Sequence, residues 1–155
     1  MTGLLLAIHV VAAILTIGPV TVSSSMFPPA LRAALAAPED ARKSGVVMVL
    51  ARTTRVYSVI GIIVPVFGLA TGASLGVLGD PWLIASIILT VAAAAILLGL
   101  IIPAQRQALA LVGTGPAPAG VVAPGALARN TGIFNLLWVI VVVLMIYRPG
   151  STTGV

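Results

Sequence analysis

Long apolar runs separated by short polar connections dominate the chain. Four of these runs contain no Asp, Glu, Lys or Arg, and they cover about 3–26, 56–78, 82–103 and 131–147. An α-helix rises 1.5 Å per residue, so about 20 apolar residues cross the roughly 30 Å hydrocarbon layer of a bilayer. The pattern therefore predicts four membrane-spanning helices.

Composition agrees with a membrane protein and not with a soluble one. The 155 residues are 60% hydrophobic and only 7% charged, and the mean hydropathy is +1.23. Soluble domains carry about 25% charged residues, and a globule with far fewer cannot cover its surface in water. We therefore predict an all-α, integral membrane four-helix bundle that forms a single membrane domain over residues 1–155.

The positive charges predict an orientation. Seven of the eight Lys and Arg residues lie in the connections at about 27–55 and 104–130, and only Arg148 follows the last span. Lys and Arg are enriched in short cytoplasmic loops. Both connections are therefore predicted to be cytoplasmic, with the spans running up-down-up-down and both termini outside (N-out/C-out). Arg52 and Arg55, just before the second span, are predicted to contact lipid headgroups.

Prolines indicate where the helices should bend or stop. Pro19 and Pro65 lie inside the first and second spans and should weaken them, because proline lacks the N–H that a helix needs. Pro28 and Pro29 are predicted to end the first helix, and Gln105, Arg106 and Gln107 mark the exit of the third span from the membrane.

The connections contain their own local signals. An alanine-rich stretch at 30–37 predicts a short interfacial helix. Pro38-Glu39-Asp40 is typical of a helix start and predicts a helix from about Glu39 that runs into the second span. Asp80 lies in a compact turn between the second and third spans, which should therefore be antiparallel neighbours. Residues 113–125 are rich in Gly and Pro and predict a loop.

Small and polar residues suggest how the spans pack. Gly68, Gly72 and Gly76 repeat every four residues and so share one helix face, where another backbone can approach closely. The alanines and Gly99 of the third span are the expected partner surface, although a homo-oligomer contact would use the same ridge. Asn135 is predicted to form an interhelical hydrogen bond with Ser or Thr.

His9, the only histidine, is the main candidate for chemistry. An ionisable side chain inside a membrane span is a functional candidate, and imidazole binds haem and copper or relays protons. Met145 is expected near the same outer level, so His9 and Met145 together form a candidate metal site. The alternative is a neutral His9 that bonds to a backbone carbonyl or a hydroxyl.

Several function classes are excluded or disfavoured. The chain has no cysteine, which removes disulfides, iron–sulfur clusters and cysteine nucleophiles. It also shows no paired carboxylates, phosphate loop, zinc-binding helix or nucleophile elbow. We expect it not to be an enzyme and expect no cofactor, apart from haem or copper at His9. Nucleic acid is not an expected partner. The net charge is +5, but the sequence has no Arg-rich stretch with interleaved aromatic residues that would form an RNA or DNA surface.

The stretch His9-Val10-Val11-Ala12-Ala13, continuing to Gly18, resembles the first helix of small bacterial predicted integral membrane proteins whose function is unknown. It also distantly resembles copper-resistance-D-like membrane domains. The resemblance implies a four-helix membrane fold and a functional role for His9. Copper-type domains usually carry an aromatic residue before the glycine and further metal ligands, whereas this chain has Thr16 and Ile17 there and no second histidine.

The sequence thus predicts a small multi-pass protein of a bacterial inner (plasma) membrane. Its expected role is that of a non-catalytic accessory or scaffold subunit of a membrane complex. Expected partners are membrane lipids and either other membrane subunits or further copies of the chain. The alternative is a transporter, or a haem- or copper-handling protein, that uses His9.

Overall fold

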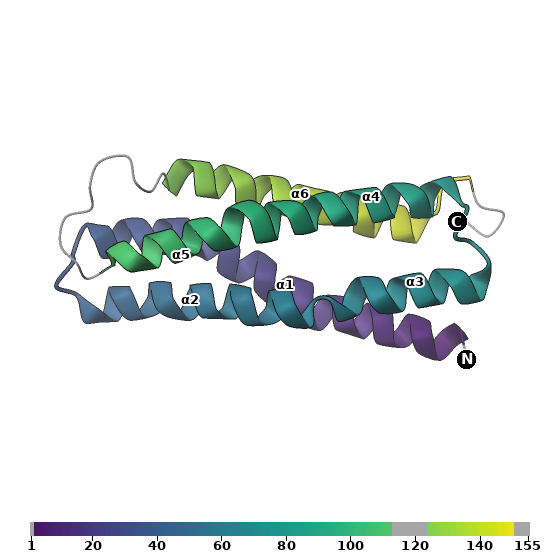
Figure 1. The fold of residues 1–155 in the computed structure, drawn as a ribbon, viewed down its shortest axis with the longest axis horizontal. Helices are drawn as coiled ribbons and strands as arrows, with labels where there is room; N and C mark the ends of the chain where they lie inside the picture. Colours follow the sequence, from purple (N-terminus) through teal and green to yellow (C-terminus); the bar gives the residue numbers. More distant parts are fainter. Residues whose placement is uncertain (1, 113–123, 151–155) are drawn as a thin grey trace.

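The protein is an all-α four-helix bundle in a computed structural model that describes residues 2–112 and 124–150 (Figure 1). The helices are α1 (Thr2–Leu35), α2 (Ala41–Ile60), α3 (Ile63–Leu75), α4 (Pro81–Ile96), the π-helical turn η1 (Leu97–Ile101), α5 (Ile102–Leu111) and α6 (Pro124–Tyr147). No strand occurs among the described residues.

Four stretches are long and apolar enough to cross a membrane, and we call them the first to fourth spans. They are Thr2–Leu35, Ala41–Leu75, Pro81–Leu111 and Pro124–Tyr147. Successive spans run in opposite directions, and the first and last helices have their terminal ends on the same side of the bundle (Figure 1). The predicted fold class is therefore confirmed, and membrane insertion is inferred from the length and hydropathy of the spans.

The first helix is longer than the sequence suggested. We expected Pro28 and Pro29 to end it and residues 30–37 to form a separate interfacial helix, but α1 continues through both prolines to Leu35. Packing explains the difference. Phe27 and Leu31 are completely buried on one face of α1, against a neighbouring helix that holds the extension in place. At 34 residues, α1 is about 50 Å long and exceeds the hydrocarbon layer.

The second span contains the bend expected from Pro65. Helix α2 ends at Ile60 and α3 begins at Ile63, so the break lies immediately before the proline. A proline ring collides with the carbonyl four residues earlier, which here belongs to Gly61. The Gly61 carbonyl instead accepts the Val64 N–H at 3.1 Å, a tighter turn than the α-helix. At its start, α2 is capped by the Asp40 carboxylate, as the sequence indicated.

The helix of the third span continues past Pro103, where the predicted membrane span ends. The five residues of η1 precede it, and the Ile102 N–H donates to the Leu97 carbonyl five residues earlier. This wider turn accommodates the proline ring, and α5 then continues to Leu111. Of the predicted loop at 113–125, residues 124 and 125 belong to α6 and the others lie outside the described residues.

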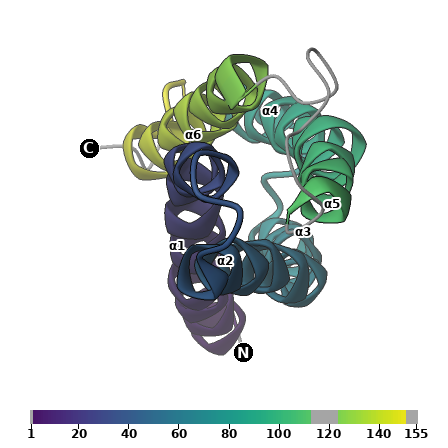
Figure 2. The ribbon, with the colours of Figure 1, turned by 90° about the vertical axis from the view of Figure 1, so that its left-hand side faces the viewer.

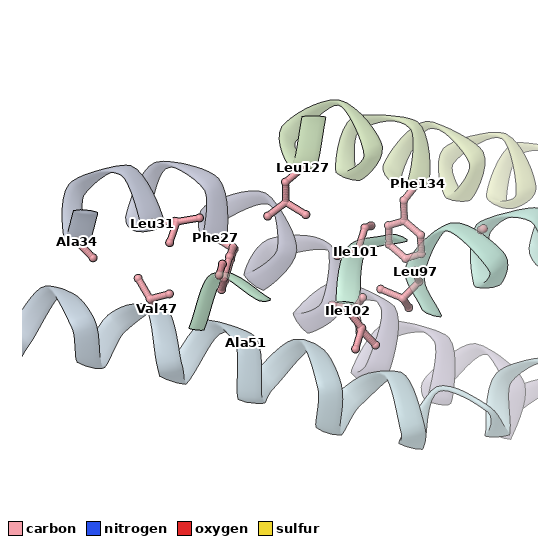
Figure 3. Packing of buried hydrophobic residues seen from close by; sticks show 13 residues of the cluster. Phe27, Leu31, Ala34, Val47, Ala51, Leu97, Ile101, Ile102, Leu127 and Phe134 are labelled. Atoms are coloured by element: carbon pink, nitrogen blue, oxygen red, sulfur yellow. The ribbon is translucent and has the colours of Figure 1, made fainter. Parts of the chain in front are cut away.

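The main hydrophobic core lies toward the end of the bundle where α1 ends and α2 begins (Figure 1), and Figure 3 shows its packing. Phe27 and Leu31 of α1 face Val47 of α2, while Leu127 of α6 and Ile101 of η1 close the cluster from the other side. Much of the stretch predicted as a polar connection at 27–55 is thus helical and packed. Viewed along its length, the bundle shows its spans arranged around a common centre (Figure 2).

Candidate functional site

His9 lies against the second span and is held by two contacts. Its Nδ1 donates to the backbone carbonyl of Val64 at 2.8 Å. The ring also rests on Gly68, where an added Cβ would be 2.8 Å from His9 Cε1. The glycine therefore provides the space that the imidazole occupies. With Nδ1 protonated, a neutral ring keeps its Nε2 lone pair free, and no hydrogen bond to Nε2 is found among the described residues.

The three glycines of the predicted ridge have three different surroundings. Gly68 faces His9 of α1, whereas a Cβ on Gly72 would meet Leu83 of α4 at 2.9 Å. Gly76 caps α3 in the left-handed conformation, with φ of 72°, and open space surrounds its Cβ position. The ridge is thus not a continuous surface for the third span. Gly99, an expected partner, also faces open space.

The structure does not bring His9 to Met145. The contacts of His9 are on α3, and the backbone carbonyl of Met145 accepts from Arg148 at the end of α6. The first turns of α1 and the last turns of α6 are separated in both views of the bundle (Figures 1 and 2). Among the described residues, no group of three or more His, Cys, Asp or Glu side chains could hold a metal ion. A copper site made by His9 and Met145 does not fit this arrangement.

A buried polar cluster joins three of the spans. Thr54, fully buried on α2, donates its only hydroxyl proton to the Leu50 carbonyl at 3.0 Å. It therefore accepts from Ser23 of α1 at 2.8 Å and from the Gln105 amide of α5 at 3.4 Å. Gln105 is only 2% exposed. In the sequence it looked like a polar residue at the exit of the third span, so its buried structural role was not recognised.

An apolar cavity of about 110 Å³ lies between the four spans. The break at Gly61, the residue Pro65 and the start of η1 at Leu97 all line it, so two of the helix irregularities meet there. Irregular turns inside membrane helices are often found at functional sites. The other lining residues are Ile17, Val20, Tyr57, Ser58, Ile62, Thr90, Ala94, Leu98, Phe134 and Trp138.

One stripe of α6 carries buried polar atoms that have no hydrogen-bond partner among the residues that the structure describes. They are Thr131 Oγ1, Asn135 Oδ1 and Trp138 Nε1, spaced four and three residues apart and so on one helix face. The other amide atom of Asn135, Nδ2, donates to Ser25 of α1 at 2.9 Å, an interhelical bond of the predicted kind. An unpaired buried polar atom costs about 1–3 kcal/mol, which makes this stripe unusual.

Two charged residues, Asp80 and Arg148, lie at the end of the bundle where α4 begins and α6 ends. Asp80 is the N-cap residue of α4, but its side chain forms no capping hydrogen bond; its carboxylate accepts from Trp82 Nε1 at 3.0 Å instead. Arg148 lies over the Trp82 ring, 5.6 Å from its centroid, and ties the end of α6 to the start of α4. Arg52 and Arg55 are exposed on α2, and their contact with lipid headgroups stays a prediction.

Comparison with protein-family models, curated proteins and solved structures gave no match for the chain. The site must therefore be judged from its own geometry. Sequence reasoning missed the cavity, because it forms only where four spans converge. It also missed the unpaired Trp138, whose indole looked like one more apolar residue. The sequence signals that could have indicated a cavity were Pro65 and Pro103, because each proline distorts a helix of the same bundle.

Proposed function

We propose that the protein is a non-catalytic accessory or scaffold subunit of a larger complex in a bacterial inner membrane. The contrast between its interior and its outer surface supports this function. His9, Thr54 and Asn135 join one span to another through hydrogen bonds, of which the Thr54–Ser23 bond is buried. Such bonds hold a bundle together and provide no chain of charged groups across it.

The outer surface offers a place for a partner helix. An open apolar groove of about 430 Å³ runs between α1 and the junction of α2 with α3. Ala7 and Ala12 lie in it beside Val11 and Leu15, and small residues of this kind allow another helix to approach closely. We assign the groove to a transmembrane helix of a different subunit.

Native mass spectrometry of gently solubilised membranes tests this proposal. The expected result is a complex that contains this chain and at least one different subunit. Ala7→Leu, which fills part of the groove, should release that subunit, whereas Ala95→Leu on the exposed side of α4 should not. A chain recovered only alone or only with copies of itself would contradict the proposal.

The second candidate is a transporter, or a haem- or copper-handling protein, that acts through His9. The observation in its favour is the Nδ1–H bond to the Val64 carbonyl, since metal-bound histidines commonly donate their other ring N–H to such a group. The remaining ligands would have to come from another chain, because Met145 is remote. Haem absorbance, or copper that is retained by the native chain and lost in His9→Ala, would favour this candidate.

A further inference from the structure

We propose that the lipid-facing side of the second and third spans binds an anionic phospholipid, with its phosphate between Arg55 of α2 and Arg106 of α5. One acyl chain of this lipid would lie across an apolar opening between Ile62 and Leu98. The site belongs to the chain itself and requires no partner subunit.

A buried contact shows how α2 and α5 lie against each other at this place. The Gln105 amide donates to the Thr54 hydroxyl at 3.4 Å, and both side chains are buried. The two spans run in opposite directions (Figure 1). Arg55 and Arg106 are the next residues, each turned about 100° further around its own helix. Because the helices are antiparallel, the two rotations bring both arginines to the same side of the helix pair, about 3 Å apart along its axis.

No acidic side chain neutralises this pair of arginines. Both are exposed, and the one ion pair among the described residues joins Lys43 to Asp40. The chain contains only three acids, which are Glu39, Asp40 and Asp80. Asp40 caps the start of α2, about 22 Å from Arg55 by helix rise, and Asp80 precedes α4 at the other end of the bundle. Two unpaired positive charges near the predicted membrane surface attract an anionic headgroup.

The distance of the acids also selects the headgroup. Arginine forms paired hydrogen bonds with phosphate oxygens, so two guanidinium groups on one side suit a phosphate. A zwitterionic headgroup would bring its ammonium group next to Arg55 and Arg106, and no carboxylate is near enough to bind it. An anionic lipid such as phosphatidylglycerol has no ammonium group, so its phosphate binds without an opposing repulsion.

An apolar opening lies deeper in the membrane between the same two spans. Ile62 and Leu98 line it and are 62% and 60% exposed, which places them at its lipid-facing edge. By helix rise, Ile62 is about 10 Å from Arg55, and Leu98 is about 12 Å from Arg106, both toward the middle of the bilayer. An acyl chain that descends from a phosphate at the arginines therefore reaches this opening and covers apolar surface that the bundle leaves exposed.

Arg52 provides a matched control on the same helix. It is exposed like Arg55 and lies one turn away, at nearly the same depth. It is about 200° around α2 from Thr54, however, so it lies on the side that faces away from α5. A diffuse positive surface would use Arg52 and Arg55 equally, whereas a site between the two spans uses Arg55.

Native mass spectrometry of the purified full-length chain in a neutral detergent tests the site. We expect a single phosphatidylglycerol to bind at least roughly fivefold more tightly than phosphatidylcholine with the same acyl chains. Arg55→Gln and Arg106→Gln should each weaken this binding roughly fivefold, and Arg52→Gln less than about twofold. All three arginines are exposed, so each variant should keep the circular dichroism spectrum of the parent chain.

Two further measurements identify the ligand and the position of its chain. Glycerophosphoglycerol is the same headgroup without acyl chains, and it should not displace the lipid at equal concentration. Phosphatidylglycerol with a photoreactive group in the upper part of one acyl chain should label Ile62 and Leu98. This labelling should persist in Arg52→Gln and fall in Arg106→Gln.

Four results would overturn the proposal. They are equal binding of the two lipids, an equal loss of binding in Arg52→Gln and Arg55→Gln, displacement by glycerophosphoglycerol at equal concentration, and photolabelling that spreads evenly over exposed side chains of the other spans. Leu15 of α1 and Val139 of α6 are 61% and 59% exposed and serve as the reference positions for the photolabel.

Discussion

The two halves of the bundle are built differently. The half where α1 ends and α2 begins contains almost the whole main core, with Phe27, Leu31 and Ile101 fully buried. In the half near the termini, α3 is held chiefly by α1, and its contacts include the His9–Val64 bond. The cavity lies between these two regions. The comparison indicates that one half fixes the fold, while the other keeps the room that a ligand or a partner would need.

The largest expected effect comes from the compact half. Phe27→Ala should lower the free energy of unfolding by about 3–5 kcal/mol, because it leaves a cavity in a filled core. Met26→Ala is the matched control, since Met26 is 52% exposed on the neighbouring position of α1. Unfolding in SDS, followed by circular dichroism, measures both. Equal losses in the two variants would mean that this half is no better packed than the outer surface.

A smaller effect is expected where α1 meets α3. Gly68→Ala should cost about 1–3 kcal/mol, because the new Cβ would overlap the His9 ring. His9→Ala in the same chain should relieve that clash, so the double variant should be more stable than additivity predicts. Gly45→Ala is the control, as nothing lies within 4 Å of its Cβ position. Strict additivity of the two changes would show that His9 does not rest on Gly68.

The smallest of these effects concerns the buried polar cluster. Thr54→Val removes the acceptor of Ser23 and Gln105 and should cost about 0.6–1.7 kcal/mol, the range measured for hydrogen bonds between membrane helices. Thr90→Val should cost less, because the Thr90 hydroxyl bonds only within its own helix. The same SDS unfolding assay compares them. A larger loss for Thr90→Val would place the important polar contact in the other half.

The sequence predicted the architecture well because its signals are local. Apolar runs without charge define the spans, Pro65 predicted the break in the second span, and Pro38-Glu39-Asp40 predicted the start of α2 to within two residues. The prediction that Pro28 and Pro29 end the first helix was wrong, because packing overrode these helix breakers. Helix α1 continues beyond Pro28 because its residues there are buried against a neighbouring helix. The third span continues beyond Pro103 because the π-turn before it makes room for the proline ring.

The candidate site was only partly predictable. His9 and the glycine spacing were visible in the sequence, but their partners depend on how the helices are rotated and crossed. Gly68 therefore turned out to face His9 and not the third span. The cavity needs residues from all four spans, and an unpaired atom such as Trp138 Nε1 cannot be recognised before its neighbours are known.

The central claim is that four helices cross a membrane with both termini outside, and cysteine labelling tests it most directly. The chain has no cysteine, so single cysteines report one position each. In intact cells, Gly79→Cys, in the turn between the second and third spans, should react with a membrane-impermeant maleimide. Glu39→Cys, just before α2, should react only after the membrane is opened. Labelling of Glu39→Cys in intact cells, with protection of Gly79→Cys, would contradict the proposed orientation, and equal labelling of both would contradict the four-span arrangement.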